Sequence, residues 1–336
     1  MTQAIRTTVV GSYPVPQWLR AMPSGPNLRD AILVVMKTQE LAGIDVISDG
    51  ELSRFDVNFP DANGMIDYFV HPLEGVDPQL TRAELERFRS RPEFEFRSSP
   101  AGIVRGPLGA GMLDLRSDYE GVKALASQPL KFTVTSPYML ARTLLAPEDK
   151  ALASLVMEIA EILRQQVAGI DAPVLQVDEA NLPGSPQNAD LAAEGINRVL
   201  QGASGEKGVH LCFGNYGGQS IQQGFFRDLL PFFNSLDCDH LILEFARRGY
   251  DELEVFGELK PSISLGLGVV DIKDNEAESP DEIARRIEHA VNVLGADRIR
   301  WVHPDCGFWM LQRSVADRKM RALVAGRDAA STAGSG

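Results

Sequence analysis

The sequence predicts an α/β fold, a closed (β/α)8 TIM barrel with one long insertion after its second strand. Eight short apolar runs rich in β-branched residues recur along the chain, and longer helix-like stretches lie between most of them. Strands that alternate with helices at this spacing form parallel sheets, and eight such units are enough to close a barrel. An open, doubly wound sheet would give similar local signals and stays the alternative fold.

Each expected strand ends in small or polar residues that break its apolar run. The eight runs are TTVVGS (7–12), DVISDG (45–50), KFTVTS (131–136), VLQVDE (174–179), GVHLCFG (208–214), HLILEF (240–245), ISLGLGVVD (263–271) and IRWVHPDCG (299–307). Because parallel strands all point the same way, the polar residues at their carboxyl ends should meet at one rim of the barrel.

Three stretches between the runs have the pattern of amphipathic helices. Residues 28–43 and 148–169 both end on glycine, which is the usual residue at a helix C-terminus. Residues 279–295 open with Ser279 as the N-cap and Pro280 at the first helical position.

The spacing of the strands is irregular once, between the second and the third run. This stretch contains NFPDANGMIDYFVHPLEGV and the charged TRAELERFRSRPEFEFRS, and it predicts an insertion over roughly 55–130 with its own hairpin or helices near the barrel mouth. We therefore expect one catalytic domain over 1–330 and a disordered tail at 331–336.

The composition limits the kinds of partner. The chain has 336 residues with 33 basic and 46 acidic side chains, a net charge of −13, which argues against a general nucleic-acid or anionic-membrane binder. We find neither a signal peptide nor an apolar run of the roughly 18 residues that span a membrane. The three cysteines lie far apart in the sequence, so we do not expect a disulfide framework. The expected location is the cytoplasm.

In a barrel of this type the reacting groups come from the carboxyl ends of the strands and from the loops that follow. The strand ends supply thirteen polar or ionisable side chains: Ser12, Asp49, Glu51, Ser136, Asp178, Glu179, His210, Cys212, Glu244, Asp271, Lys273, Asp305 and Cys306.

Four of these side chains form a plausible zinc site. His210 and Cys212 are two apart in a strand and so point to the same face. Glu244 ends the next strand and Cys306 ends the last one. Zinc binds imidazole nitrogen, thiolate sulfur and carboxylate oxygen in a tetrahedral arrangement, so this set of donors suits it.

The alternative for such residues is a structural role, because cysteine is among the most buried residue types. Cys238 precedes its strand and is interpreted as structural, and His240 and His303 precede their strand ends and are interpreted as ordinary polar positions. Glu244 and Asp178 differ from these, since each closes an apolar strand where a carboxylate without a metal or cation would be costly.

The motifs together resemble a known family, the C-terminal catalytic barrel of cobalamin-independent methionine synthase and the related single-domain thiol alkyltransferases. The resemblance is carried by VVGSYP, DGELSR, VDEANLPG, HLCFGNYGG, LILEF, LGLGVVDIKDNEAESPDEIARRI and WVHPDCGFWMLQR, which cover most of the chain apart from the insertion. The ordered set of H-x-C, a distant Glu and a late D-C-G is specific.

The resemblance implies a zinc ion held by His210, Cys212, Glu244 and Cys306. In that family zinc activates the thiol of homocysteine, which then attacks an electrophilic methyl or alkyl carbon. The metal is needed because a free alkyl thiol is mostly protonated at neutral pH, whereas the thiolate is the nucleophile.

The resemblance also implies how the amino-acid part of homocysteine is bound. Ser12 and the backbone of Gly11 resemble the turn that binds the carboxylate, and Glu51 and Asp178 resemble the acidic pair that holds the ammonium. Asp178 and Lys273 are the expected catalytic residues.

Three departures from the family pattern bear on the methyl donor. The family's VDEPAL reads VDEANL here, with Asn181, and the histidine of its YDIHS, which delivers a proton to the folate leaving group, is replaced by Lys273. The N-terminal half of the long enzyme, which helps to bind folate, has no counterpart. Arg247 and Arg248 follow Glu244 and would hold an anionic thiol or donor, or lie on the surface.

The expected function is therefore a zinc-dependent thiol methyltransferase that makes methionine from homocysteine, with methyl-tetrahydrofolate or a methyl-corrinoid protein as the donor. One alternative is an epoxyalkane:coenzyme M transferase, whose thiol carries a sulfonate and no ammonium. A further alternative is a barrel without catalysis that binds zinc, a porphyrin or a corrinoid.

Overall fold

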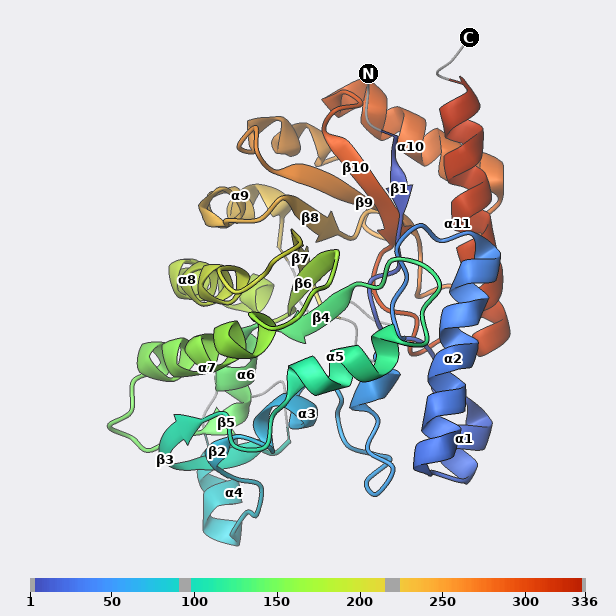
Figure 1. The fold of residues 1–336 in the computed structure, drawn as a ribbon. Helices are drawn as coiled ribbons and strands as arrows, with labels where there is room; N and C mark the ends of the chain where they lie inside the picture. Colours follow the sequence, from blue (N-terminus) through green and yellow to red (C-terminus); the bar gives the residue numbers. More distant parts are fainter. Residues whose placement is uncertain (1–3, 91–97, 215–223, 334–336) are drawn as a thin grey trace.

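The computed structural model describes residues 4–90, 98–214 and 224–333, and parallel strands curve around its centre (Figure 1). Seven strands form one sheet in the order β1-β10-β9-β8-β7-β6-β4, and neighbouring strands in it run parallel. The strands are β1 (Arg6–Thr7), β4 (Phe132–Thr135), β6 (Val174–Glu179), β7 (Glu206–Leu211), β8 (His240–Leu243), β9 (Ser264–Val270) and β10 (Ile299–Pro304). The predicted parallel α/β architecture is confirmed.

The second predicted strand, residues 45–50, is reduced to two isolated bridges. Val46 pairs with Thr8 and Ile47 pairs with Leu130, both in parallel, so this segment joins the two ends of the seven-stranded sheet. The prediction of a full strand was wrong because the segment turns at once into a left-handed conformation at Gly50 and Glu51, with φ of 72° and 58°.

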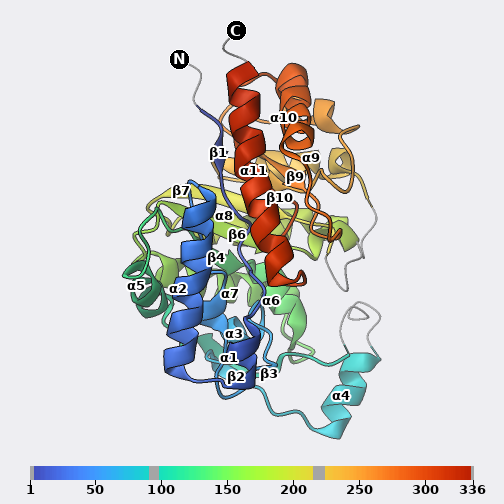
Figure 2. The same cartoon turned by 90° about the vertical axis from the view of Figure 1, so that its right-hand side faces the viewer.

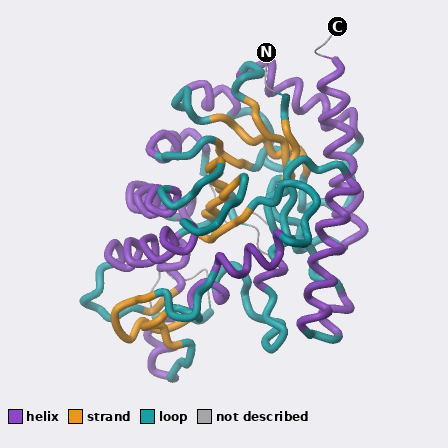
Figure 3. The backbone as a smooth tube through the Cα atoms, viewed as in Figure 1, coloured by secondary structure: helices purple, strands orange, loops and turns teal. Residues whose placement is uncertain are grey.

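Helices surround the strands on the outside (Figures 1 and 3). Figure 2 shows α2 and α11 side by side, which brings the beginning and the end of the chain together. The helices outside the insertion are α1 (Gln17–Ala21), α2 (Gly25–Ala42), α6 (Pro137–Thr143), α7 (Leu152–Val167), α8 (Ala189–Leu200), α9 (Phe226–Ser235), α10 (Pro280–Leu294) and α11 (Arg313–Ala333). Short 3-10 turns lie at Leu52–Arg54, Leu182–Gly184, Pro186–Asn188 and Leu253–Glu258.

The helix ends follow the sequence signals. Ser279 caps α10 by accepting a hydrogen bond from the amide of Glu282 at 3.2 Å, and Pro280 is the first helical residue. Gly43 ends α2 in the left-handed conformation with φ of 86°.

The insertion forms a small α/β unit whose first part, from α3 to β3, lies low in the views of Figures 1 and 2, while its last helix, α5, lies higher, beside the barrel. Its elements are α3 (Asp67–Val70), β2 (Glu74–Asp77), α4 (Arg82–Arg89), β3 (Gly102–Gly109) and α5 (Leu115–Lys123). β2 and β3 pair in an antiparallel manner, and the short β5 (Leu144–Leu145) after α6 pairs with β3. The predicted hairpin and helices are present.

The strands divide the interior into two different layers. Side chains that face the helices are apolar, as at Leu175 and Val177 of β6, and they belong to the main hydrophobic core. Alternate positions face the inside of the barrel and are largely polar, as at Gln176 and Asp178. The candidate functional groups therefore stand inside the barrel, on strands whose outer faces are firmly packed.

Glycines make room for these polar side chains. A Cβ atom at Gly266 would lie 2.9 Å from His303 Nε2, and one at Gly268 would collide with the carboxylate of Asp305. Small residues on β9 therefore allow polar groups on β10 and directly after it to occupy the inside of the barrel.

Among the described residues, no helix is both long and apolar enough to cross a membrane. α11 continues to Ala333, so residues 331–333 of the predicted disordered tail are helical, and residues 334–336 lie outside the described residues. Residues 215–218 of the HLCFGNYGG motif also lie outside them.

Candidate metal and amino-acid site

Three of the four predicted metal ligands meet at one end of the barrel. His210, Cys212 and Cys306 each offer one donor atom, and these atoms lie within 4.8 Å of one another. Cys306 Sγ lies 3.7 Å from His210 Nε2. On the other side of the ring, His210 Nδ1 donates to the carbonyl of Ile242 at 2.8 Å. This bond orients the imidazole and leaves Nε2 available as a ligand, which is the arrangement that metal-binding histidines use.

The electrostatics of the three groups also suit a metal. A hydrogen bond from Cys212, together with the neighbouring His210, holds the pKa of Cys306 well below its ordinary value despite its burial. Burial by itself would lower the pKa of His210, but the adjacent Cys306 and Asp178 raise it to about 9. The same hydrogen bond, together with burial, raises the pKa of the Cys212 thiol, so the two thiols are shifted in opposite directions. Two sulfurs and one imidazole nitrogen form a donor set that zinc accepts, with a fourth position left for another ligand.

Glu244 does not belong to this cluster of three. Its carboxylate lies 3.8 Å from the ammonium of Lys273 and accepts a hydrogen bond from the amide of Phe213 at 3.3 Å. Burial raises the pKa of Glu244, and Lys273 counteracts this effect. The fourth predicted ligand therefore faces a cation of its own chain in this structure.

Lys273, which follows β9, lies beside Glu244, which follows β8. Only 3% of its side chain is exposed, and its ammonium lies 3.8 Å from the carboxylate of Glu244. A buried lysine needs a counter-charge, and the carboxylate of Glu244 on the adjacent strand supplies it.

The two arginines after Glu244 differ from each other. Arg247 is 57% exposed and lies 3.4 Å from a carboxylate oxygen of Asp271. Arg248 is largely buried, with its guanidinium 3.7 Å from the centre of the Phe213 ring and donating to the carbonyl of Gly224 at 2.7 Å. Among the described contacts, neither guanidinium pairs with a residue of the metal cluster.

Glu51 lies against the turn predicted to bind a carboxylate. It is a non-glycine residue with positive φ, a strained conformation that is common at functional sites. A Cβ atom at Gly11 would collide with the Glu51 side chain, so glycine there lets this carboxylate lie against the turn. The hydroxyl of Thr133 donates to Glu51 Oε1 at 3.0 Å, and the buried guanidinium of Arg54 lies 3.5 Å from the same oxygen.

Ser12 and Asp178 complete the predicted amino-acid site. Ser12 is packed against the turn after Cys306, since a Cβ atom at Gly307 would collide with its hydroxyl. Asp178 is buried and stands opposite His210 on the neighbouring strand. Burial, with a contribution from Glu51, raises the pKa of Asp178 to about 7. The structure thus places the predicted metal and amino-acid groups on adjoining segments.

The side chain of Glu179 points away from the inside of the barrel, unlike that of Asp178. Its carboxylate accepts hydrogen bonds from the hydroxyl of Ser136 and from the amides of Asn181 and Leu182, so it shapes the turn after β6. The departure from the family pattern at Asn181 is therefore part of a turn that Glu179 holds.

Sequence reasoning gave no role to several groups that support the site. Asp305 accepts hydrogen bonds from the amides of residues 245–247 at 2.9, 2.9 and 2.8 Å, and so connects the turn after Glu244 to the segment that bears Cys306. Arg54, Lys131 and Gln176 were not singled out either. A signal existed for the last two, because a lysine opening a buried strand and a glutamine two residues before Asp178 both face the inside of the barrel.

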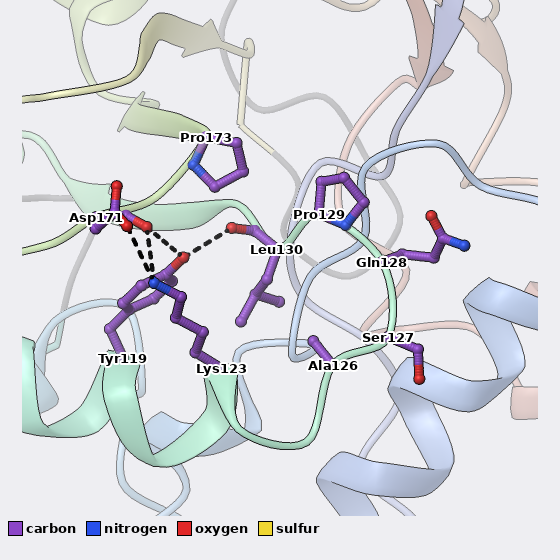
Figure 4. A pocket seen from close by; sticks show the side chains of 9 residues that line it. All are labelled: Tyr119, Lys123, Ala126, Ser127, Gln128, Pro129, Leu130, Asp171 and Pro173. Atoms are coloured by element: carbon purple, nitrogen blue, oxygen red, sulfur yellow. Dashed lines mark hydrogen bonds and ion pairs between the residues drawn. The ribbon is translucent and has the colours of Figure 1, made fainter.

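A hollow of about 450 Å³ lies at the opposite end of the barrel, before the strands begin. Figure 4 shows its lining side chains, in which Tyr119 donates to the carbonyl oxygens of Leu130 and Asp171, and Lys123 also reaches Asp171. Tyr119 and Lys123 lie on α5, and their partners lie in the loops that precede β4 and β6, at the end of the barrel that carries residues for stability. We therefore do not assign the reaction to this hollow.

Comparison with known proteins agrees with the motifs. The model of the family described as cobalamin-independent synthase, catalytic domain, matches residues 5–331. The chain belongs to this family. The resemblance inferred from the sequence motifs is confirmed. Proteins similar to this chain include the methionine synthases of Thermococcus kodakarensis, 27% identical, and Saccharolobus solfataricus, 25% identical. Each alignment covers 95% of this chain, and 91% and 93% of the respective relative.

Solved structures show the same fold. A B12-independent methionine synthase from Shewanella sp. W3-18-1, in complex with selenomethionine, matches with a TM-score of 0.79 and 22% identity over 98% of both chains. A putative vitamin-B12-independent methionine synthase from Listeria monocytogenes matches with a TM-score of 0.71 and 18% identity, again over 98% of both chains. At these identities the likeness establishes the barrel fold of the cobalamin-independent synthase family.

Proposed function

We propose that this protein is a zinc-dependent methyltransferase that converts homocysteine to methionine. The observation that carries the proposal is the cluster of His210, Cys212 and Cys306, with donor atoms within 4.8 Å, beside the buried carboxylate of Asp178. Membership of the cobalamin-independent synthase family and the names of its archaeal relatives support the same reaction.

The residues have separable tasks in this proposal. A zinc ion bound by His210, Cys212 and Cys306 would supply a Lewis acid at which the substrate thiol loses its proton. Asp178 and Glu51 hold the ammonium of homocysteine, and the turn at Gly11 and Ser12 receives its carboxylate. Two buried carboxylates suit an ammonium, because an uncompensated negative charge in this position is costly.

Glu244 remains our proposed fourth ligand. To bind the metal its carboxylate has to turn from Lys273 toward the three-residue cluster. Zinc-edge X-ray absorption of the loaded protein tests this assignment by counting oxygen and sulfur neighbours. We expect two sulfurs and one carboxylate oxygen without substrate, and a third sulfur when homocysteine is added. No added sulfur with homocysteine would reject the proposed function. Addition of a sulfur by coenzyme M in preference to homocysteine would instead favour the epoxyalkane:coenzyme M reaction.

We infer that a methyl-corrinoid is a better donor than methyl-tetrahydrofolate. A folate leaving nitrogen needs a proton, whereas a reduced cobalt does not. Lys273 stands where the family has the proton-donating histidine, and its ammonium is paired with Glu244 at 3.8 Å. A lysine ammonium is ordinarily a much weaker acid than the imidazolium of a histidine, which opposes the transfer.

Single-turnover methyl transfer to homocysteine, with methylcobalamin and with monoglutamyl methyl-tetrahydrofolate, tests the donor. We expect the wild type to be faster with methylcobalamin and Lys273→His to gain rate with the folate. A fast wild-type rate with the folate that is unchanged in Lys273→His would refute the donor inference. It would leave the thiol half of the proposal intact.

A further inference from the structure

Lys131 is a cation buried inside the barrel, and the proposed reaction does not use it. Only 3% of the residue is exposed. It lies at the start of the β4 segment, one residue after the bridge that closes the barrel at Leu130. Taking a charged ammonium out of water costs several kcal/mol, so a lysine in this place calls for an explanation.

The ammonium of Lys131 begins a directional chain of hydrogen bonds. It donates to Gln176 Oε1 at 2.7 Å and also to the carbonyl of Val9. Because Oε1 is thus engaged, the amide group of Gln176 can be oriented in only one way. Its Nε2 then donates to Asp178 Oδ1 at 2.6 Å and to the carbonyl of Val10 at 2.8 Å.

This chain of hydrogen bonds reaches both sides of the proposed amino-acid site. At one end it fixes one oxygen of Asp178, the carboxylate proposed to hold the ammonium. At the other it holds the carbonyls of Val9 and Val10, which directly precede Gly11 and Ser12.

The charges are consistent with this arrangement. Burial lowers the pKa of Lys131 to about 7, and nearby Asp178 and Glu51 oppose that effect. The burial of Lys131 is thus partly offset by the nearby carboxylates, which places a cation and its partners in one hydrogen-bonded network beside the proposed ammonium site.

We propose that Lys131, acting through Gln176, is a positioning residue that orients the Asp178 carboxylate and so gives the site its preference for thiols that carry an amino group. The inference rests on the proposed function, because it takes homocysteine as the thiol. Lys131 touches neither the substrate nor the metal in this scheme.

Calorimetric titration of the zinc-loaded protein with two thiols tests the proposal. Homocysteine carries the amino group, and 4-mercaptobutanoate is the same molecule without it. In Lys131→Met we expect homocysteine to bind about 10-fold or more weakly, since one charge-assisted bond is left unsupported. Affinity for 4-mercaptobutanoate should change by less than about 3-fold, and zinc content should not change.

A double-mutant comparison separates positioning from general damage. In an Asp178→Asn background, Lys131→Met should reduce homocysteine affinity by less than about 3-fold, because the group it positions is already altered. Gln176→Met interrupts the chain while it keeps the lysine, and should reproduce the loss of amino-group preference. If Lys131→Met does not fold, the Gln176→Met variant tests the proposal in its place.

Lys319→Met is the matched control. Lys319 is also fully buried, but its ammonium pairs with Glu278 at 2.9 Å and does not contact the Gln176 chain. Its removal should leave the ratio of the two thiol affinities unchanged. Equal losses for both thiols in Lys131→Met and Gln176→Met, or full additivity with Asp178→Asn, would overturn the inference. A wild type that binds neither thiol would instead reject the proposed function.

Discussion

Both ends of the barrel contain a histidine and a carboxylate. The two ends differ in how many cationic partners surround the carboxylate. At the amino ends of the strands, Glu206 lies 2.6 Å from Arg6, 3.3 Å from Arg300 and 3.0 Å from His240, and accepts a hydrogen bond from Trp301 at 2.9 Å. Burial would raise the pKa of Glu206, but these partners lower it well below its ordinary value.

At the carboxyl ends the carboxylates have fewer cations. Asp178 has a single hydrogen bond from Gln176 among the described contacts, and burial raises its pKa to about 7. This contrast indicates that one end uses its charges for stability, while the other keeps charges partly uncompensated so that a metal and an ammonium can complete them. Substitutions at the two ends should therefore separate stability from function.

The largest effect is expected at the metal cluster. Cys306→Ser removes a thiolate ligand, and we expect zinc affinity to fall by more than about 100-fold and turnover to be abolished, while the fold is kept. Metal analysis after competition with a chelator measures the first effect. Cys238→Ser is the control, because Cys238 is buried outside the cluster. Normal zinc content and activity in Cys306→Ser would remove Cys306 from the ligand set.

Glu206→Gln should show the reverse pattern. The variant leaves Arg6, Arg300 and His240 without their common counter-charge. We expect the free energy of unfolding to fall by about 1–3 kcal/mol. This is less than for a fully buried ion pair, because both arginines are about one-third exposed. Urea unfolding measures it. Zinc content should be normal. Asp171→Asn, which removes an exposed partner of Lys123, should change the stability little. Loss of zinc in Glu206→Gln would contradict the claim that the charges at this end of the barrel serve stability alone.

The same carboxylate predicts a dependence of stability on pH. The folded-state pKa of Glu206 lies below its unfolded value, so its contribution is complete above about pH 4–5 and is lost as the pH falls through the folded pKa. Wild type and Glu206→Gln should therefore differ most near neutral pH and converge in acid. A stability difference that stays constant between about pH 2 and 7 would show that the ionised form of Glu206 does not stabilise the fold.

Asp178→Asn should weaken binding without weakening the fold. We expect homocysteine binding to lose about 1.5–3 kcal/mol, because one charge-assisted contact with the ammonium is removed. The free energy of unfolding should not fall at about pH 8, where the buried carboxylate is costly to ionise. Calorimetry and urea unfolding measure the two quantities, and zinc affinity should change less than homocysteine affinity. Homocysteine binding at the wild-type level would mean that Asp178 does not hold the ammonium.

The smallest effect is expected at Arg247. Its guanidinium is 57% exposed and its ion pair with Asp271 spans 3.4 Å, so Arg247→Gln should alter homocysteine affinity by less than about 3-fold. A larger loss, especially for a sulfonate-bearing thiol, would revive the interpretation of this arginine as an anion-binding residue.

Much of the architecture follows from local patterns in the amino-acid sequence. The alternation of short apolar runs and amphipathic stretches predicts the parallel barrel, because each periodicity is local and is set by which side chains need burial. The H-x-C spacing predicts that His210 and Cys212 share a face, since residues two apart in a strand always do. The ordered motifs also predicted the family.

Which groups meet was decided by the tertiary structure. The predicted strand at 45–50 is reduced to two bridges, because the chain turns sharply at Gly50 and Glu51. Lys273 and Glu244 paired, which no spacing could reveal, since they lie on different strands and meet through burial. The chain from Lys131 through Gln176 to Asp178 likewise depends on side-chain directions across the barrel. Contacts between distant segments are settled by the packing of the whole barrel, where each buried charge must find its partner.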